Sequence, residues 1–561
     1  MEKNTTSLIY RIFAALLSIV LLVLSGFAAY QIVTLNVLPS KLLLPVILMI
    51  VILNTILILL MNFATHAIWT KVISVILVIL VGCTMGFGNV YLYETYSTLT
   101  SVTGAEKGSI KNTISVITKT DHDEEIQSLK SEKIGVLRNI DSVGTKKCQK
   151  KLEKYSFSYK KYDNLQALVK ALYEDEIQAI VMNEIYRANV EEMEEYSGFS
   201  NETKSIYQTV YYTNNKNDAL VVDDITKNPF TIFVSGNDTY GKIDELSRSD
   251  VDMIVTVNPT TSTVLMVNIP RDYYVQTSYG YDKLTHTGMY GIEETKQTVE
   301  NLLGIDINYT FRVNFSSAED IVDALDGVDI KVPKGMAVER LNADWALEGV
   351  HEGWNHLNGA RALAYARERH AYVDGDIQRA KNQQQVLEAI IKKAASSKIL
   401  TNYTKLLKSF KNAFDTNMST NEITALLQYE LQAMPNWKFQ NYVLRGTNSS
   451  AVCASMAQEL SVVMPEDYCV SIARQKIEAV LDGKSANKIK DEYDTGAAGV
   501  AEGYIEQENA QAQGSVYYDY SQNYDYGYTD QEQQYEEPSI NEEPLPEMVN
   551  SHETNYCCIG Y

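Results

Sequence analysis

The sequence has few of the residues from which metal cages and nucleotide sites are built. Its six cysteines among 561 residues include no CxxC pair, and the only histidine near any of them is His552, close to Cys557 and Cys558. A structural zinc site uses four closely spaced Cys or His ligands, so this pattern disfavours one. The chain also has neither a GxxxxGK[ST] loop nor a GxGxxG turn, so it shows no sign of nucleotide binding.

Signatures of several hydrolase classes are missing too. The chain has no GxSxG elbow, no HExxH helix and no Cys–His–Asn signature, which disfavours serine, zinc and cysteine hydrolases. The formal net charge is −22, and the last 71 residues carry 16 acidic side chains and no basic one, so the remainder has a net charge of −6. Nothing resembles a basic nucleic-acid footprint, and we expect no nucleic-acid partner.

Long apolar runs are confined to the first hundred residues. Ser7 to Val33, Leu42 to Ala64 and Ala67 to Leu92 each supply about 20 predominantly apolar residues. At about 1.5 Å per residue, each run is long enough to cross a hydrocarbon core of about 30 Å. We expect three transmembrane helices within residues 1–100, and a cleaved leader is disfavoured because two more spans follow the first.

Basic residues near these runs indicate the topology. Lys3 and Arg11 flank the first run, Lys71 lies beside the second loop, and the first loop has only Lys41. The positive-inside rule then favours a cytoplasmic N-terminus. With three spans, the chain after Thr98 lies outside the cell, as part of a multi-pass cell-membrane protein.

Residues 125–225 are predicted to form a small α/β module. Ile134–Leu137, Phe157–Tyr162 and Ala179–Met182 are predicted strands, and Asn164–Tyr173 is a predicted helix capped by Asp163. The segment weakly resembles part of a periplasmic-binding-protein-like domain. A spacer domain without a ligand is the alternative.

A larger α/β domain is predicted for residues 229–485. Thr231–Gly236 is a predicted strand, and the turn-rich residues 258–263 join two more, Val251–Val257 and Val264–Ile269, as a hairpin. Helical patterns follow at Ile292–Leu303, Ser317–Leu325, Gly359–Ala366, Gln378–Ser396 and Asn421–Ala433.

The C-terminal residues 490–561 are predicted to be disordered. From residue 491 onward the chain holds 11 tyrosines with many acidic, Gln, Asn and Gly residues, and it has few aliphatic side chains from which to build a core. Within the larger domain, Cys453 and Cys469 are either a disulfide or two buried thiols.

Arginines and carboxylates gather where predicted strands and helices of the larger domain end. They form three clusters: Asp238 with Arg248 and Asp250; Arg271 with Asp272; and Arg367, Arg369 and Arg379 with Asp374 and Asp376. Any single pair is typical of a structural salt bridge. Several arginines in one cleft would repel one another without an anion, and the guanidinium fork suits phosphate. Two carboxylates could hold Mg²⁺, which often bridges carboxylates and substrate phosphates.

Four motifs in order resemble the LytR-CpsA-Psr family. They are SRSDVDMIVTVNPTTSTVLMVNIPRDYYV, KLTHTGMYG, LNGARALAYARERH and DGDIQRAKNQQQVLEAI, and the resemblance covers residues 230–483. It implies an α/β/α fold with a hydrophobic tunnel for a lipid. It also implies a membrane-anchored extracellular phosphotransferase that moves an anionic glycopolymer, such as teichoic acid or capsule, from a polyprenyl-pyrophosphate carrier to a peptidoglycan acceptor.

The resemblance also assigns residues to roles by position. Asp238 and Asp250 resemble the residues that hold Mg²⁺. The residues that resemble the phosphate-binding set are Arg248, Arg271, Arg367, Arg369, Arg379, Gln383 and Lys283. Asp272 is a candidate base only because it adjoins Arg271, and a structural role is equally compatible. His286 and His370 are more typical of hydrogen-bonded structural residues than of proton carriers.

Two other functions fit the same sequence. A non-catalytic membrane sensor would bind lipid phosphate without turning it over. A pyrophosphatase acting on the polyprenyl-pyrophosphate-linked glycan would use the same arginines with water as the acceptor. The fate of the glycan distinguishes these activities.

Overall fold

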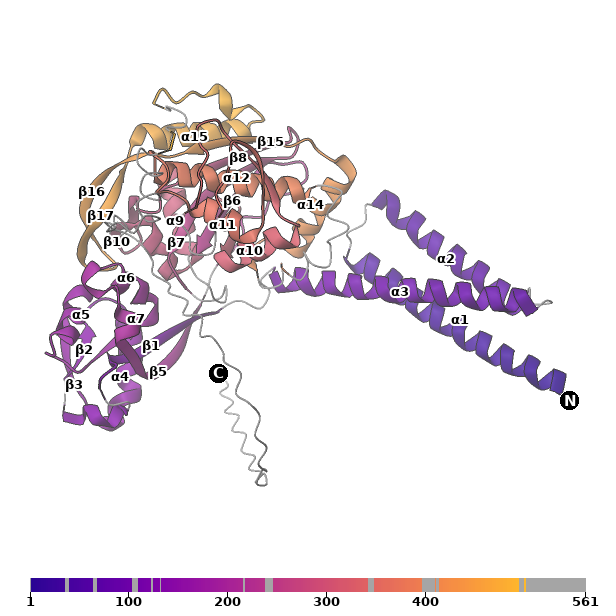
Figure 1. The fold of residues 1–561 in the computed structure, drawn as a ribbon, viewed down its shortest axis with the longest axis horizontal. Helices are drawn as coiled ribbons and strands as arrows, with labels where there is room; N and C mark the ends of the chain where they lie inside the picture. Colours follow the sequence, from indigo (N-terminus) through magenta and orange to yellow (C-terminus); the bar gives the residue numbers. More distant parts are fainter. Residues whose placement is uncertain are drawn as a thin grey trace. The chain divides into compact units, whose positions relative to one another are not determined.

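The computed structural model describes residues 2–35, 40–63, 68–102, 109–122, 125–131, 133–214, 217–237, 246–341, 348–395, 409, 413–493 and 499–500. Three long helices come first: α1 (Glu2–Leu35), α2 (Ser40–Phe63) and α3 (Ile68–Val102). Their apolar spans have mean hydropathies of 2.6, 3.0 and 2.2, and at most 28% of each span is buried. By length and composition all three could cross a membrane, as the sequence predicts. They lie side by side (Figure 1), and Asn89 donates to the Leu24 carbonyl at 2.9 Å.

The small module is a five-stranded sheet flanked by short helices. Its strands are β1 (Ser109–Lys119), β2 (Lys133–Leu137), β3 (Ser158–Tyr162), β4 (Ala179–Asn183) and β5 (Thr203–Asn214), in the order β3-β2-β4-β1-β5. Strand β2 pairs in parallel with β3 and β4, as a βαβ arrangement requires. Its helices are α4 (Ser142–Leu152), α5 (Leu165–Tyr173), α6 (Arg187–Glu191) and α7 (Phe199–Glu202).

One detail of the module differs from the prediction. Helix α5 is capped by Asn164, whose side chain accepts from the Ala167 amide at 2.8 Å. Asp163 is not the cap, because it lies one residue too early and forms an ion pair with Arg138 at 2.9 Å. The three predicted strands and the helix are otherwise confirmed.

The larger domain is built on a mixed sheet that, within the described residues, has six strands. They are β6 (Phe230–Asn237), β7 (Ser249–Asn258), β8 (Thr263–Ile269), β11 (Tyr309–Asn314), β14 (Phe414–Thr416) and β15 (Lys438–Val443), in the order β14-β11-β6-β7-β8-β15. The predicted hairpin of β7 and β8 is confirmed, while β11 and β15 add in parallel to β6 and β8.

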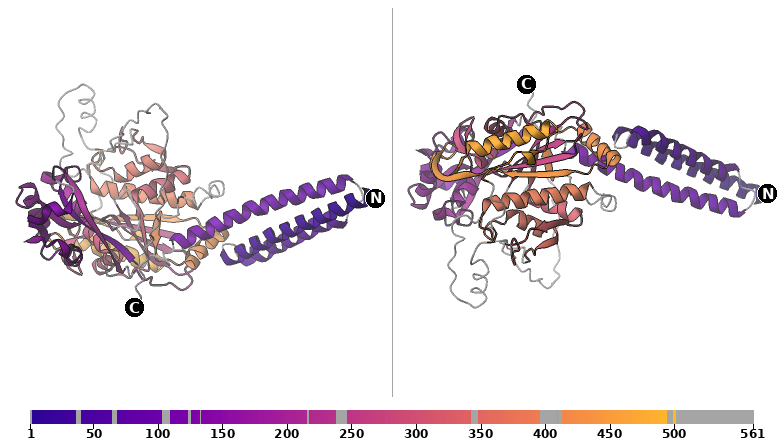
Figure 2. Two further views of the ribbon diagram at one scale, coloured as in Figure 1. Left: turned by 90° about the horizontal axis from the view of Figure 1, so that it is seen from below. Right: turned by 90° about the horizontal axis from the view of Figure 1, so that it is seen from above.

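Helices cover both faces of this sheet (Figure 2). Helices α9 (Ile292–Leu303) and α15 (Asp467–Leu481) share a core with Leu265 and Val267 of β8. Leu387 of α12 (Asp376–Ala394) packs on the opposite face, beside Met266. Every residue of β8 is buried, as expected for a strand covered on both sides. The layering is α/β/α, as predicted.

The remaining elements surround this core. They are α8 (Leu284–Thr287), α10 (Phe315–Ala324), α11 (Gly359–Arg367) and α14 (Thr420–Ala433), with the strand pairs β9 (Tyr274–Thr277) and β10 (Gly280–Lys283), β12 (Val328–Val332) and β13 (Gly353–Leu357), and β16 (Gly446–Cys453) and β17 (Gln458–Pro465). The helices predicted from periodicity are confirmed to within a few residues at each end.

Two predictions about the end of the chain change. The disordered segment was predicted to begin at residue 490, but Asp491 belongs to the folded domain: its Oδ2 lies 2.6 Å from Arg445 Nη1 and accepts from the Tyr442 hydroxyl at 2.9 Å. Residues 501–561 lie outside the described residues. Cys453 and Cys469 are free buried thiols, so the disulfide is not formed.

Candidate functional site

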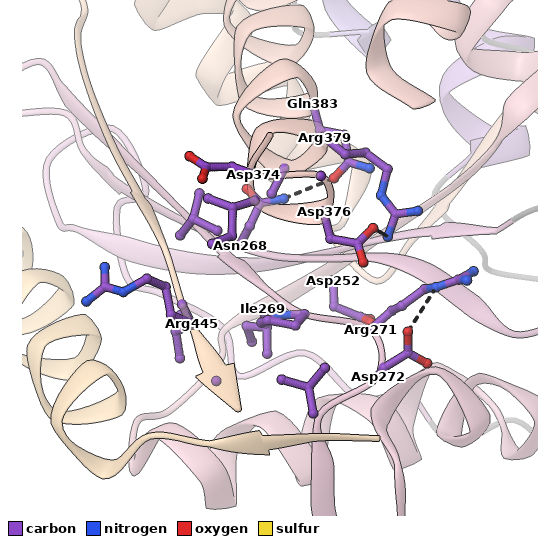
Figure 3. Close-up of a pocket in the computed structure, with 18 of the residues that line it drawn as sticks. Asp252, Asn268, Ile269, Arg271, Asp272, Asp374, Asp376, Arg379, Gln383 and Arg445 are labelled. Atoms are coloured by element: carbon purple, nitrogen blue, oxygen red, sulfur yellow. Dashed lines mark hydrogen bonds and ion pairs between the residues drawn. The ribbon is translucent and has the colours of Figure 1, made fainter. Parts of the chain in front are cut away.

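A cavity of about 330 Å³ lies in the larger domain where β7, β8 and β15 meet the N-terminus of α12. Figure 3 shows its polar side chains converging from these elements. Its charged lining consists of Asp250 and Asp252 from β7, Arg271 and Asp272 after β8, Asp374, Asp376 and Arg379 around the start of α12, and Arg445 after β15. Residues nearly 200 positions apart are therefore brought to one site.

Arg271 stands at the centre of a chain of ion pairs. Its Nη1 donates to Asp250 Oδ1 at 2.6 Å, and its Nε lies 3.6 Å from Asp272 Oδ2. Lys283 extends the chain, because its Nζ lies 2.9 Å from Asp272 Oδ1. Burial raises the pKa of Asp272, but the charges of Arg271 and Lys283 outweigh this and hold the pKa below its usual range. Asp272 is therefore ionised, and it is a weak base.

A second group of cations lies at the start of α12. Arg379 Nη2 is 2.9 Å from Asp376 Oδ1, and Arg369 Nη1 is 3.9 Å from the same oxygen. Burial and the nearby charges of Arg271 and Arg369 lower the pKa of Arg379, although Asp376 opposes this. Like charges this close favour binding of an anion, which would reduce their mutual repulsion.

Gln383 follows one turn later on α12. Its Oε1 accepts from Asn268 Nδ2 of β8 at 3.1 Å (Figure 3), so the helix and the sheet are joined across the cavity. This contact orients the side-chain amide of Gln383, which the family resemblance predicts to bind phosphate.

The other predicted residues lie apart from this lining. Arg248 is buried, and its Nη1 lies 2.5 Å from Glu192 Oε2 in the small module. Arg367 is the last residue of α11. Neither residue, nor Lys283 or Arg369, is among the described residues that line the cavity. Asp238, the other predicted Mg²⁺ ligand, lies outside the described residues.

His286 and its neighbours form a hydrogen-bonded network near the cavity. The ring Nδ1 of His286 is 2.6 Å from Asp282 Oδ1, and Asp282 Oδ2 accepts from the Ser455 amide at 2.7 Å. Cys453 is close enough for the three side chains to surround a metal ion. Burial, however, raises the pKa of its thiol to about 12, which keeps it protonated. The Asp282 carboxylate is already hydrogen-bonded, which favours the structural role predicted for His286.

Close packing against the start of β7 explains the glycine of KLTHTGMYG. A Cβ at Gly288 would lie 2.7 Å from the Ser247 carbonyl oxygen and 2.8 Å from the Ser249 amide nitrogen. Real Cβ atoms do not approach backbone this closely, so the segment reaches the start of β7 only with glycine here. The motif thus positions the strand that carries Asp250.

Sequence reasoning missed four polar residues of the cavity: Asp252, Asn268, Arg445 and Asn448. Asp252 follows Asp250 by two positions, a spacing that places both on one face of a strand and could have identified it. Burial raises the pKa of Asp252 to about 8, and Asp250 adds to this effect. Asn268 and Arg445 gave no usable signal, because each depends on a partner distant in sequence: Gln383 and Asp491.

The site can accommodate a hard cation. Asp250 Oδ2 is buried and has no hydrogen-bond partner among the described residues, while Oδ1 accepts from Arg271. Buried carboxylate oxygens without partners are uncommon, and oxygen is the ligand that Mg²⁺ prefers. Together with the arginines, this set can bind a phosphorylated group from several sides.

Comparison with known proteins agrees with this geometry. Residues 193–462 match the model of the LytR_cpsA_psr family. A Bacillus anthracis protein named polyisoprenyl-teichoic acid–peptidoglycan teichoic acid transferase TagU is 33% identical over 250 residues, which are 44% of this chain and 77% of that protein. The chain belongs to the LytR-CpsA-Psr family. Its α/β/α domain is the part of the chain that carries the family's motifs.

Other LytR-CpsA-Psr proteins are similar over the same region. The Bacillus subtilis transferase TagT is 34% identical over 209 residues, which are 36% of this chain and 64% of that protein. A solved structure described as the LytR-CPS2A-psr family protein YwtF (TagT) with bound octaprenyl pyrophosphate lipid is 25% identical, with a TM-score of 0.36, and the match covers 48% of this chain and 97% of the other.

Proposed function

We propose that this protein transfers an anionic glycopolymer of the teichoic acid class from a polyprenyl-pyrophosphate carrier to peptidoglycan. The observation that carries the proposal is the pair of partly buried arginines, Arg271 and Arg379, that lines one cavity with Gln383 and carboxylates. The names of the TagU and TagT relatives support the same activity.

The proposed reaction is a phosphoryl transfer. A hydroxyl of peptidoglycan attacks the glycan-side phosphorus of the carrier, and a new P–O bond forms. The bond from that phosphorus to the bridging oxygen breaks, and polyprenyl phosphate leaves. The hydroxyl proton passes to a base or to solvent. Negative charge grows on the phosphoryl oxygens and on the leaving phosphate, so fixed cations on both lower the barrier.

Arg271 is proposed to bind the phosphoryl oxygens from one side and Arg379 from the other. The guanidinium of Arg271 is held in place by Asp250 and Asp272, so little orientation entropy is lost when substrate binds. Asp272 then acts as a positioning residue for Arg271 and Lys283, because its lowered pKa makes it a poor base. Gln383 is proposed to donate its amide NH₂ to a phosphate oxygen.

Arg248, Arg367 and Arg369 retain the substrate-binding roles that the family motifs imply. Arg369 is the best placed of the three, since it shares Asp376 with Arg379. Asp238 and Asp250 are proposed to hold Mg²⁺. When bound, Mg²⁺ would neutralise phosphate charge and orient the pyrophosphate.

The three apolar helices are proposed to anchor the chain in the cell membrane, with the larger domain outside the cell. This topology would present the cavity on the side where peptidoglycan lies. A carrier with its polyprenyl chain in the bilayer would then reach the site without leaving the membrane.

The test is a reaction of the full-length protein in lipid nanodiscs with a polyprenyl-pyrophosphate-linked teichoic saccharide, with and without peptidoglycan oligomers. Acceptor-dependent formation of a glycan–peptidoglycan product supports the transferase. Release of glycan phosphate at the same rate without acceptor would identify a pyrophosphatase. Binding of the carrier without turnover would identify a lipid-phosphate sensor.

A further inference from the structure

Asp252 occupies an unusual position for a carboxylate. It lies in the interior of β7, paired with Ser235 of β6 and Ile269 of β8, and only 1% of its surface is exposed. It also lines the cavity beside Arg271 (Figure 3). A fully buried acidic side chain in a central strand is unfavourable unless its environment gives it a partner.

Its two oxygens have different environments. Oδ1 accepts from the Ser249 hydroxyl at 2.6 Å, whereas Oδ2 is buried and has no hydrogen-bond partner among the described residues. Asp250 repeats the pattern, with Oδ1 on Arg271 and Oδ2 without a partner in the same part of the chain. Two residues of one strand that line the same cavity thus each have a buried carboxylate oxygen without a hydrogen-bond partner in the described part of the chain.

A β-bulge places these two side chains together. Asn237 of β6 pairs with Ser249 and Gly236 pairs with Val251, so Asp250 is the extra residue without an opposite partner. Bulges redirect side chains and are common beside active sites. Both residues line the cavity, Asp250 from the bulge and Asp252 from its regular position in the strand.

We propose that Asp252 supplies a further carboxylate ligand, beside Asp250, to the divalent cation that this site binds. The proposal rests on the proposed function for the identity of the site. It adds a ligand that the family motif does not assign. Hard divalent cations take several oxygen ligands, and Asp250 and Asp252 each have a carboxylate oxygen without a hydrogen-bond partner among the described residues.

The test measures binding of Mn²⁺ alone, by electron paramagnetic resonance, to the full-length protein in detergent micelles without substrate. Asp252→Asn keeps the shape of the side chain and removes its charge, and it is expected to weaken Mn²⁺ binding at least about tenfold, as Asp250→Asn should. Asp374→Asn is the matched control: it removes one charge from the same cavity away from β7, and it should change the affinity less than about threefold.

Three results would overturn the proposal. They are Mn²⁺ binding by Asp252→Asn within about twofold of wild type, an equal loss in Asp374→Asn, and no Mn²⁺ binding by the wild-type protein at millimolar concentration. Thermal unfolding in EDTA checks folding, and Asp252→Asn should be at least as stable as wild type because it buries no ionisable group. None of these results depends on glycan transfer, so failure of this proposal is distinguishable from failure of the transferase activity.

Discussion

Replacing Arg271 with lysine separates the charge of this residue from its geometry. The guanidinium reaches Asp250 Oδ1 at 2.6 Å and Asp272 Oδ2 at 3.6 Å. A lysine ammonium keeps the charge, but it is a single point with a different reach, and it cannot pair with two carboxylates while presenting a planar fork to phosphate. The variant should therefore fold but transfer poorly.

The expected loss follows from one missing transition-state contact. Removing one preorganised donor typically raises a barrier by about 3–4 kcal/mol, so kcat for Arg271→Lys should fall about 100- to 1,000-fold. Arg271→Met should differ in kind. Asp272 keeps Lys283, but Asp250, whose side chain is 8% exposed, loses its cation, and breaking a largely buried ion pair typically destabilises a protein by about 3–5 kcal/mol.

The assay is glycan transfer at saturating carrier, with thermal unfolding of the same samples. The lysine variant should keep most of its stability and lose transfer, whereas the methionine variant should lose both. Transfer by Arg271→Lys within about threefold of wild type would refute the reasoning, because charge alone would then suffice at this position.

Three further predictions concern the same domain. Burial raises the pKa of Asp252 to about 8 in the folded protein, so between about pH 4 and 8 the folded state keeps a proton that the unfolded state has lost. The free energy of unfolding in EDTA should therefore fall as pH rises through this range, by up to about 1.4 kcal/mol per pH unit. Thermal unfolding of Asp252→Asn should show a flatter pH dependence. An unchanged slope would contradict the burial of an ionisable group. Asp491→Ala should destabilise the domain by about 3 kcal/mol and lower Tm by several degrees, because it leaves Arg445 without its carboxylate. An unchanged Tm would show that Asp491 belongs to the unstructured tail. Gly288→Ala should reduce the free energy of unfolding by about 1–3 kcal/mol and lower Tm by a few degrees, because the added Cβ would lie 2.7–2.8 Å from backbone atoms. A Tm equal to that of the wild type would show that this backbone can shift without cost.

Local patterns predict most of the fold. Helix α9 shows a clear apolar period and begins and ends where predicted, at Ile292 and Leu303. Strand β8 is an apolar run that follows a turn-rich segment, and it is recognised from these local features alone. The cap of α5 was misplaced by one residue because Asp163 and Asn164 are both good caps, and only backbone geometry selects between them.

The candidate site was predictable only in part. Arg271 and Arg379 lie within family motifs, and the structure brings both to one cavity. Arg445 was missed because its role depends on Asp491, which composition assigned to a solvated tail. Asp252 was missed because a carboxylate inside an apolar strand resembles an exposed position until both neighbouring strands are in place.

The central claim is that the bond to the bridging oxygen of the carrier breaks and that the glycan moves with its own phosphate to peptidoglycan. It is tested most directly with carrier labelled with ³²P in the glycan-side phosphate, full-length protein in nanodiscs, Mg²⁺ and peptidoglycan oligomers. The label should appear in a glycan–phosphate–peptidoglycan diester, with unlabelled polyprenyl phosphate released. Label recovered as free glycan phosphate despite competent acceptor, or retained on the lipid, would contradict the transferase.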